Sequence, residues 1–94
     1  MLLFSWFKRI PKERKIIKME KKEVEKHNVL DDCWVIIENN VYDVTEFIEY
    51  HPCGRNIFLN YGGKDVTEIF NRVHPYVSYK ELLKYEQVGY LENE

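Results

Sequence analysis

The sequence predicts one α+β domain in which a small mixed sheet carries two helical hairpins. The first observation behind this prediction is a β-branched and aromatic stretch over residues 33–44, interrupted once by a pair of asparagines, which is typical of a β-hairpin. The second is the dipeptide His-Pro, which occurs twice, each time between amphipathic segments. A chain of 94 residues is long enough to bury one core.

The first part of the domain is expected to form most of the sheet. Its predicted elements are an edge strand at 16–19, a helix at 20–27 whose main apolar contact is Val24, a loop at 28–32, a strand at 33–38 and a returning strand at 41–44. The strands at 33–38 and 41–44 are joined by Asn39-Asn40. Because Asn tolerates positive φ, this pair predicts a tight turn.

The first helical hairpin is expected to follow directly. Thr45 is a suitable N-cap for a short helix carrying Phe47 and Ile48. This helix must end at His51, since Pro52 disfavours helical geometry in the residue before it. The second helix of the hairpin is predicted over residues 55–61, with Ile57, Phe58 and Tyr61 on one face and Gly62-Gly63 as its C-terminal cap.

The second hairpin repeats the arrangement. Asp65, with Glu68 three residues later, predicts a capped helix start. The helix places one apolar stripe at i, i+3, i+4 and i+7, namely Val66, Ile69, Phe70 and Val73. It stops at His74-Pro75. A second capping box at Ser78–Glu81 opens a helix with Leu82, Leu83 and Tyr85, and residues 88–91 are expected to form the closing strand.

Charge divides the chain into a basic leader and an acidic domain. Residues 1–22 carry eight Lys/Arg and two Glu, a net +6, whereas residues 23–94 carry six Lys/Arg and fourteen Asp/Glu, a net −8. We place the boundary at residue 16, with an aromatic and basic leader over 1–15 and the domain over 16–94. The acidic domain disfavours nucleic acid as a partner. The leader is either a flexible extension or a peripheral membrane contact.

The two histidines at the bends are the candidate chemical centre. Neutral imidazole is a good axial ligand for haem iron, and a pair of imidazoles fills both axial sites, so such a centre moves single electrons. One alternative is a zinc site made of Cys33, His51, Cys53 and His74, although their spacing is not that of close ligand pairs. Another is a Cys53–His51 nucleophile, for which no orienting group is evident. The third histidine, His27, lies in a polar setting and is not expected to be a ligand.

Over roughly residues 17–91 the chain resembles the cytochrome b5 domain. The matching stretches are His27-Asn28, Asp31–Val35, Val41–Phe47, His51-Pro52-Cys53-Gly54, Gly62–Thr67, Phe70 and His74. The family pattern His-Pro-Gly-Gly has Cys53 in place of its first glycine. Pro75 also departs from the pattern, because many members carry Ser at that position.

The resemblance implies a haem crevice between the two hairpins and non-covalent haem b ligated by His51 and His74. The residues that it implies for the crevice lining are Phe47, Ile57, Phe58, Val66, Phe70, Val73 and Leu82. It further implies an electron carrier, not an enzyme, that accepts one electron from an NAD(P)H-dependent reductase and passes it to an acceptor enzyme. The alternative is a haem- or steroid-binding module without redox function.

Two expectations concern the state and location of the protein. No apolar run approaches the roughly 18–20 residues of a membrane span, so no transmembrane anchor is expected. We therefore expect a monomer that is intracellular, either cytoplasmic or held at a membrane surface through residues 1–15.

Overall fold

The sheet is mixed, and its strands are not arranged in chain order. The computed structural model describes residues 14–49, 60–73 and 75–92. Within these ranges the five-stranded sheet has the order β1-β5-β4-β3-β2. The strands are β1 (Ile17–Met19), β2 (Asn28–Val29), β3 (Asp32–Ile37), β4 (Asn40–Asp43) and β5 (Gln87–Leu91). β1 pairs parallel with β5 and the other pairs are antiparallel, which confirms the predicted mixed sheet, edge strand and closing strand.

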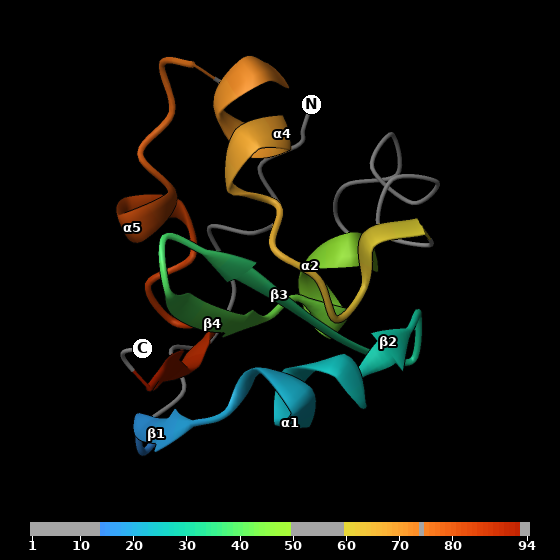
Figure 1. Ribbon diagram of the computed structural model, residues 1–94. Helices are drawn as coiled ribbons and strands as arrows, with labels where there is room; N and C mark the ends of the chain where they lie inside the picture. Colours follow the sequence, from blue (N-terminus) through green and yellow to red (C-terminus); the bar gives the residue numbers. More distant parts are fainter. Residues whose placement is uncertain (1–13, 50–59, 74, 93–94) are drawn as a thin grey trace.

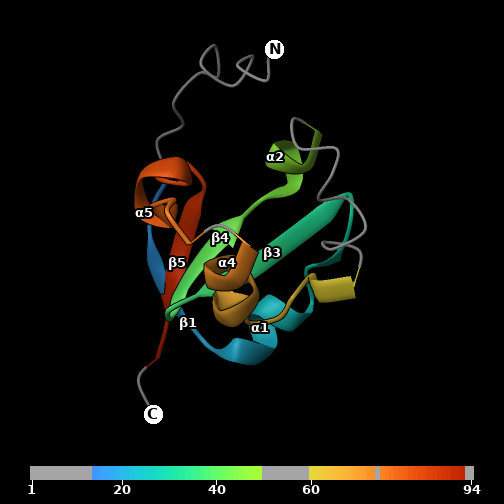
Figure 2. The same ribbon diagram turned by 90° about the horizontal axis from the view of Figure 1, so that it is seen from above.

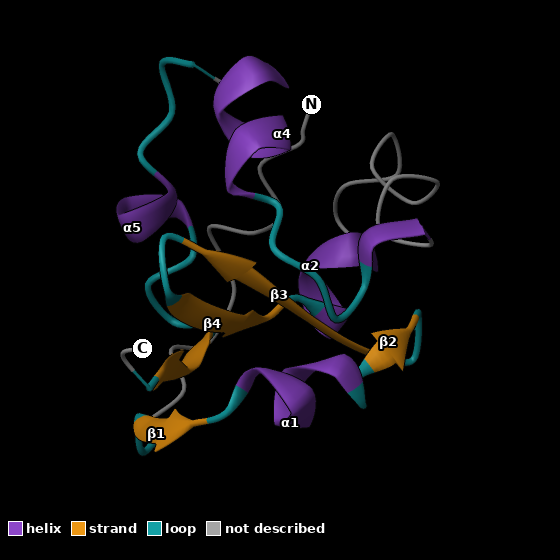
Figure 3. Ribbon diagram, viewed as in Figure 1, coloured by secondary structure: helices purple, strands orange, loops and turns teal. Residues whose placement is uncertain are grey.

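Helices cover both faces of this sheet. The described helices are α1 (Lys21–Glu25), α2 (Thr45–Glu49), α4 (Thr67–Val73) and α5 (Tyr79–Leu82). Figure 1 shows α1 below the sheet and α2, α4 and α5 above it, and Figure 3 shows the same layers by secondary structure. Viewed from above, α4 lies across β3 and β4 (Figure 2). The molecule is therefore an α+β domain, as predicted.

Alternation along β3 and β4 divides the core into two clusters. Successive side chains of a strand point to opposite faces. On the α1 side, Ile36 and Val41 pack with Met19 and Val24. On the other side lies the larger cluster, formed by Cys33, Val35, Ile37, Tyr42, Val44, Phe47, Ile48, Val66, Tyr79 and Leu83. Val24 is fully buried, which confirms it as the main apolar contact of the first helix.

The turn between β3 and β4 lies one residue earlier than predicted. Ile37 pairs with Asn40, so the two loop residues are Glu38 (φ 51°) and Asn39 (φ 70°). Positive φ at both positions is the type I′ pattern of a two-residue hairpin. A turn at Asn39-Asn40 would have placed Asp43 opposite Ile36 in the core. Burial of apolar side chains, and not the local preference of asparagine, therefore sets the register.

Three other predicted elements differ in extent. The loop expected over 28–32 contains β2, whose Asn28 and Val29 pair with Cys33 and Asp32. A two-residue strand carries too little periodicity to be recognised in a sequence. The first helix covers Lys21–Glu25 only, not 20–27. The last helix ends at Leu82, so Leu83 and Tyr85 lie in the turn that follows it.

Gly62 and Gly63 allow a close approach between the chain and the segment after α1. The Gly63 amide donates to the Trp34 carbonyl at 2.6 Å, and the φ of Gly63 is +79°. A Cβ at Gly62 would lie 3.2 Å from backbone atoms of Asn28. The pair was expected as a helix cap, and the structure adds this contact. Most of the helix predicted over 55–61 lies outside the described residues.

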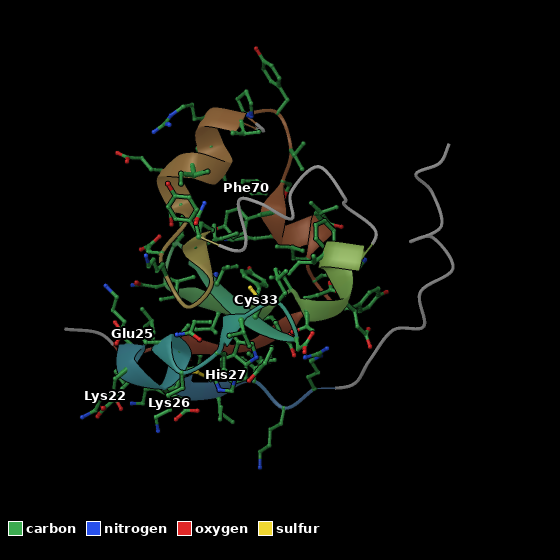
Figure 4. All side chains as sticks on the ribbon, turned by 90° about the vertical axis from the view of Figure 1, so that its right-hand side faces the viewer. Lys22, Glu25, Lys26, His27, Cys33 and Phe70 are labelled. Atoms are coloured by element: carbon green, nitrogen blue, oxygen red, sulfur yellow. The ribbon has the colours of Figure 1, made fainter. Side chains whose placement is uncertain are left out.

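His27 is held between two carboxylates on the α1 side of the sheet. Its Nδ1 lies 2.8 Å from Asp32 Oδ1, and its Nε2 lies 3.1 Å from Glu23 Oε2. The ring stacks on Trp34 with 3.6 Å between centroids and an interplanar angle of 5°. Figure 4 shows His27 beside α1, far from Phe70 on α4. That His27 is not a ligand of the predicted centre stays a prediction.

The pKa of His27 predicts a pH-dependent stability. Burial opposes the charged ring, but hydrogen bonds to Asp32 and Glu23 outweigh it and raise the pKa above its ordinary value. A raised pKa means that the stabilisation is complete below the unfolded-state pKa of about 6.5 and is lost as the pH rises through the folded-state pKa. Urea unfolding of wild type and His27→Gln across pH 5.5–8.5 measures this. We expect the difference in unfolding free energy between them to shrink as the pH rises; a constant difference would contradict the assignment.

The predicted domain boundary at residue 16 stays a prediction. Arg14 Nη1 lies 3.4 Å from Asp43 Oδ2, so a side chain just before that boundary contacts the domain. Residues 1–13, which make up most of the predicted leader, lie outside the described residues. Within the described ranges, none of the helices has the length and apolar character needed to cross a membrane.

Candidate functional site

Most of the predicted site residues that the structure describes belong to the larger core cluster or pack against it. Of the nine predicted site residues, Phe47, Val66, Phe70, Val73 and Leu82 are described. The two expected ligands, His51 and His74, lie outside the described residues, as do Ile57 and Phe58. The described helices end close to the two histidines in the chain: α2 at Glu49 and α4 at Val73.

α2 is attached to the start of β3 through an Asp-Val-Thr sequence. Asp43 Oδ1 accepts hydrogen bonds from the Thr45 amide at 3.1 Å and from the Thr45 hydroxyl at 2.7 Å. The Cys33 amide donates to Thr45 Oγ1 at 2.9 Å. Thr45 was predicted as the N-cap, but it is the first helical residue, and the preceding carboxylate satisfies its amide. The helix start is thus fixed to the sheet before the chain reaches His51.

α4 is attached to the other end of β3 by the same device. Asp65 Oδ1 accepts from the Thr67 amide at 2.9 Å and from its hydroxyl at 2.6 Å. The Glu38 amide donates to Thr67 Oγ1 at 2.8 Å. The helix begins at Thr67, so the N-cap position is residue 66. Asp65, which was predicted as the N-cap, lies one residue before that position, but its carboxylate still accepts from the first helical amide.

Backbone hydrogen bonds also hold the segment before α4 against β3. The Ile36 amide donates to the Lys64 carbonyl at 3.0 Å, and the Val66 amide donates to the Ile36 carbonyl at 2.8 Å. Asp65 therefore forms a parallel bridge with Ile36. The starts of α2 and α4 are thus both attached to β3, and the segments that carry His51 and His74 follow these two helices in the chain.

The predicted lining residues converge only in part. Phe47 and Val66 are buried in the larger cluster, and Phe70 and Leu82 are partly buried against it. Val73 is 51% exposed. Among the described residues, α4 buries none of its side chains completely, although its apolar stripe follows the predicted spacing. Figure 4 shows Phe70 on α4, on the far side of Cys33 from His27.

The predicted lining left out two buried residues of this cluster. Tyr79 is 8% exposed and makes edge contacts with Phe70 and Tyr42, at centroid distances of 6.1 and 6.0 Å. Leu83 is 3% exposed, whereas the predicted Leu82 is only partly buried. Tyr79 gave no periodic signal because α5 has only four residues.

The chemistry of Cys33 weakens the zinc alternative. The thiol is free and fully buried. Burial, with smaller contributions from Asp43 and Asp32, raises the pKa of Cys33 to about 11. Zinc is bound by thiolate, so in the metal-free protein the burial of this thiol opposes such a role. The other three candidate ligands lie outside the described residues; within them no group of His, Cys, Asp and Glu could hold a metal ion.

Comparisons with known proteins decide the family. Residues 20–92 match the family described as "Cytochrome b5-like Heme/Steroid binding domain". This chain belongs to that family. The solved structure of cytochrome b5 of Ostreococcus tauri virus 2 is 39% identical, covers 79% of this chain and 95% of its own, and superimposes with a TM-score of 0.70. The chain is also similar to cytochrome b558 of Ectothiorhodospira vacuolata, with 28% identity, 82% and 100% coverage and a TM-score of 0.70.

A longer relative places the cytochrome b5 domain in a larger protein. Cytochrome b5 reductase 4 of Rattus norvegicus is 39% identical over 95 residues, which is 93% of this chain and 18% of the rat protein. The chain therefore spans less than a fifth of that relative. The predicted cytochrome b5-like fold is confirmed, and at the level of the family the chain is a haem-binding, electron-carrying domain.

Proposed function

We propose that this chain is a small b-type cytochrome that binds haem b through His51 and His74. It takes single electrons from an NAD(P)H-dependent reductase and passes them to an acceptor enzyme. One observation carries the proposal: the starts of α2 and α4 are attached to opposite ends of β3 through the same Asp-Val-Thr anchor. The first helix of each hairpin ends just before one of these histidines.

The described residues fit haem as the bound group. Phe47, Val66, Phe70 and Leu82 come from three segments and belong to, or pack against, one apolar cluster, which suits an apolar ligand beside it. Val73, which is half exposed, is adjacent in sequence to His74. Ile57 and Phe58, which lie outside the described residues, are proposed as further lining residues. Bound haem would supply a single-electron centre, while these side chains exclude water from it.

The axial ligands can be tested by absorption spectroscopy of the haem-loaded full chain. Two imidazole ligands predict a six-coordinate, low-spin spectrum in the ferric and ferrous states. His51→Ala and His74→Ala should each abolish the low-spin spectrum. His27→Ala is the matched control, because His27 lies on the opposite face of the sheet, and it should leave the spectrum unchanged. A low-spin spectrum retained in His74→Ala would refute the proposed ligand pair.

The donor can be tested with a purified reductase. The relatives include a protein named cytochrome b5 reductase 4, which supports a reductase as the donor. With NADH and cytochrome b5 reductase present, we expect the haem of this chain to be reduced, and to be reoxidised by an acceptor. If the chain bound haem and stayed oxidised, the alternative of a haem- or steroid-binding module without redox function would be favoured. The family description includes both ligand classes.

Two further parts of the proposal concern assembly and location. We propose that the chain is a monomer. Sedimentation equilibrium of the haem-loaded chain would test this by measuring its molar mass in solution. Residues 1–15 are proposed as a peripheral contact with an anionic membrane, because an apolar and aromatic run over 1–7 is followed there by a run rich in basic residues. Binding of the full chain, but not of a chain starting at Ile16, to anionic vesicles would support this contact.

A further inference from the structure

Glu38 contacts both helices of the second hairpin. Its amide donates to Thr67 Oγ1 at 2.8 Å, at the start of α4. Its carboxylate Oε1 accepts a hydrogen bond from the Tyr79 hydroxyl, at the start of α5. His74 lies between these helices in the chain. One residue of the β3–β4 turn thus fixes the segments on both sides of His74.

Glu38 occupies an unusual backbone position for a glutamate. Its φ is 51°, in the left-handed region that such turns normally fill with Asn, Asp or Gly. Strained positions of this kind persist where the surrounding structure requires them, and they gather at functional sites. Here the turn conformation allows the amide and the carboxylate of the same residue to reach α4 and α5 together.

Tyr79 connects this turn to the predicted lining. Its ring is buried in the larger core cluster, and it makes an edge contact with Phe70 of α4 at a centroid distance of 6.1 Å. Burial and the hydrogen bond to the Glu38 carboxylate raise the pKa of Tyr79 to about 12, so the hydroxyl stays protonated and donates throughout the physiological range.

We propose that Glu38 and Tyr79 are positioning residues, whose hydrogen bond sets how the α4–α5 hairpin lies against the sheet and thereby how the His74 imidazole meets the haem iron. This inference rests on the proposed function. The carboxylate of Glu38 accepts from the Tyr79 hydroxyl and so attaches α5 to the turn, and α4 and α5 flank His74 in the chain. Loss of either hydrogen-bond partner releases α5 from the β3–β4 turn, while the ring of residue 79 stays packed in the core.

The test compares Tyr79→Phe, Glu38→Ala, the double variant and Glu38→Gln, each loaded with haem. We expect Tyr79→Phe and Glu38→Ala each to transfer haem to apomyoglobin about fivefold faster than wild type, the ratio typical of the loss of one partly exposed hydrogen bond. The double variant should be no faster than Tyr79→Phe, and Glu38→Gln, which keeps an acceptor oxygen, should stay close to wild type. Tyr76→Phe is the matched control, since that ring is 97% exposed.

A second readout separates ligand orientation from general stability. The electron paramagnetic resonance g values of low-spin ferric haem depend on the angle between the two imidazole planes. They should shift in Tyr79→Phe and Glu38→Ala and stay fixed in Tyr76→Phe. Wild-type g values and release rates in both single variants, or additive effects in the double variant, would overturn this inference alone. A wild-type chain without a low-spin spectrum would refute the proposed function and this inference with it.

Discussion

Loading with haem is expected to protect α4 from amide exchange more strongly than any other described element. α4 has seven residues, fewer than the roughly 12–15 at which isolated helices become stable in water, so its stability depends on packing. Its side chains are at most partly buried against the described protein, and Val73 is 51% exposed. A ligand bound along its apolar stripe supplies the missing contacts.

The expected size follows from linkage. A ligand that binds only the folded state, at a free concentration about 1,000-fold above its Kd, adds about 4 kcal/mol to the unfolding free energy. Hydrogen exchange with mass spectrometry, with and without haem, would measure the change for α4 and for the β3–β4 hairpin. Without haem, we expect the α4 amides to exchange through local opening of the helix. With haem bound, their exchange should slow to nearly the rate set by global unfolding. Equal protection of α4 in both states would contradict a haem site on this helix.

Val73→Asn provides the matched variant for this prediction. Because Val73 is half exposed, the substitution should change the stability of the haem-free chain by no more than about 0.5 kcal/mol. It should weaken haem binding about fivefold, since part of the burial of a valine side chain is lost. Val29→Asn, at a residue of β2 that is 55% exposed, is the control and should leave haem affinity unchanged. If Val73→Asn bound haem with unchanged affinity, Val73 would not be a lining residue of the haem site.

Replacement of Gly89 by alanine is expected to destabilise the domain by about 3 kcal/mol, the upper end of the usual cost of overpacking. A Cβ at Gly89 would lie 2.3 Å from the Ile17 carbonyl oxygen and 2.4 Å from Met19 Cε. Gly in a strand is otherwise unfavourable, so alanine would stabilise β5 if there were room. The parallel pairing of Ile17 with Gly89 removes that room.

Urea unfolding of Gly89→Ala, Met19→Ala and the double variant would identify the atom responsible. The Met19 side chain can move, but the Ile17 carbonyl belongs to the paired backbone. We therefore expect Met19→Ala not to rescue Gly89→Ala. Tyr90→Ala, at an exposed neighbour in the same strand, is the control and should cost less than about 1 kcal/mol. A cost for Gly89→Ala as small as that of the control would show that β1 does not pair with β5 in this register.

Local sequence preferences predicted the type of most elements. The run Cys33–Glu38 marked the strand β3, since β-branched and aromatic residues fit a buried pleated surface. The stripe from Val66 to Val73 marked a helix through its period, and Asp65 and Ser78 marked helix starts through their side-chain acceptors. The resemblance to cytochrome b5 is carried by ordered matches along nearly the whole domain, so the amino-acid sequence alone was sufficient to predict the correct family.

Contacts between distant residues decided the rest. The sequence pointed to Asn39-Asn40 as the turn, but burial of Ile36 against Val41 moved it to Glu38-Asn39, because register depends on which side chains reach the core. β2 and the buried Tyr79 became evident only in three dimensions, since each depends on partners far along the chain or on too few residues for a period. The common attachment of both hairpins to β3 is likewise tertiary: a threonine hydroxyl accepts from Cys33 in one case and from Glu38 in the other, across sequence separations of 12 and 29 residues.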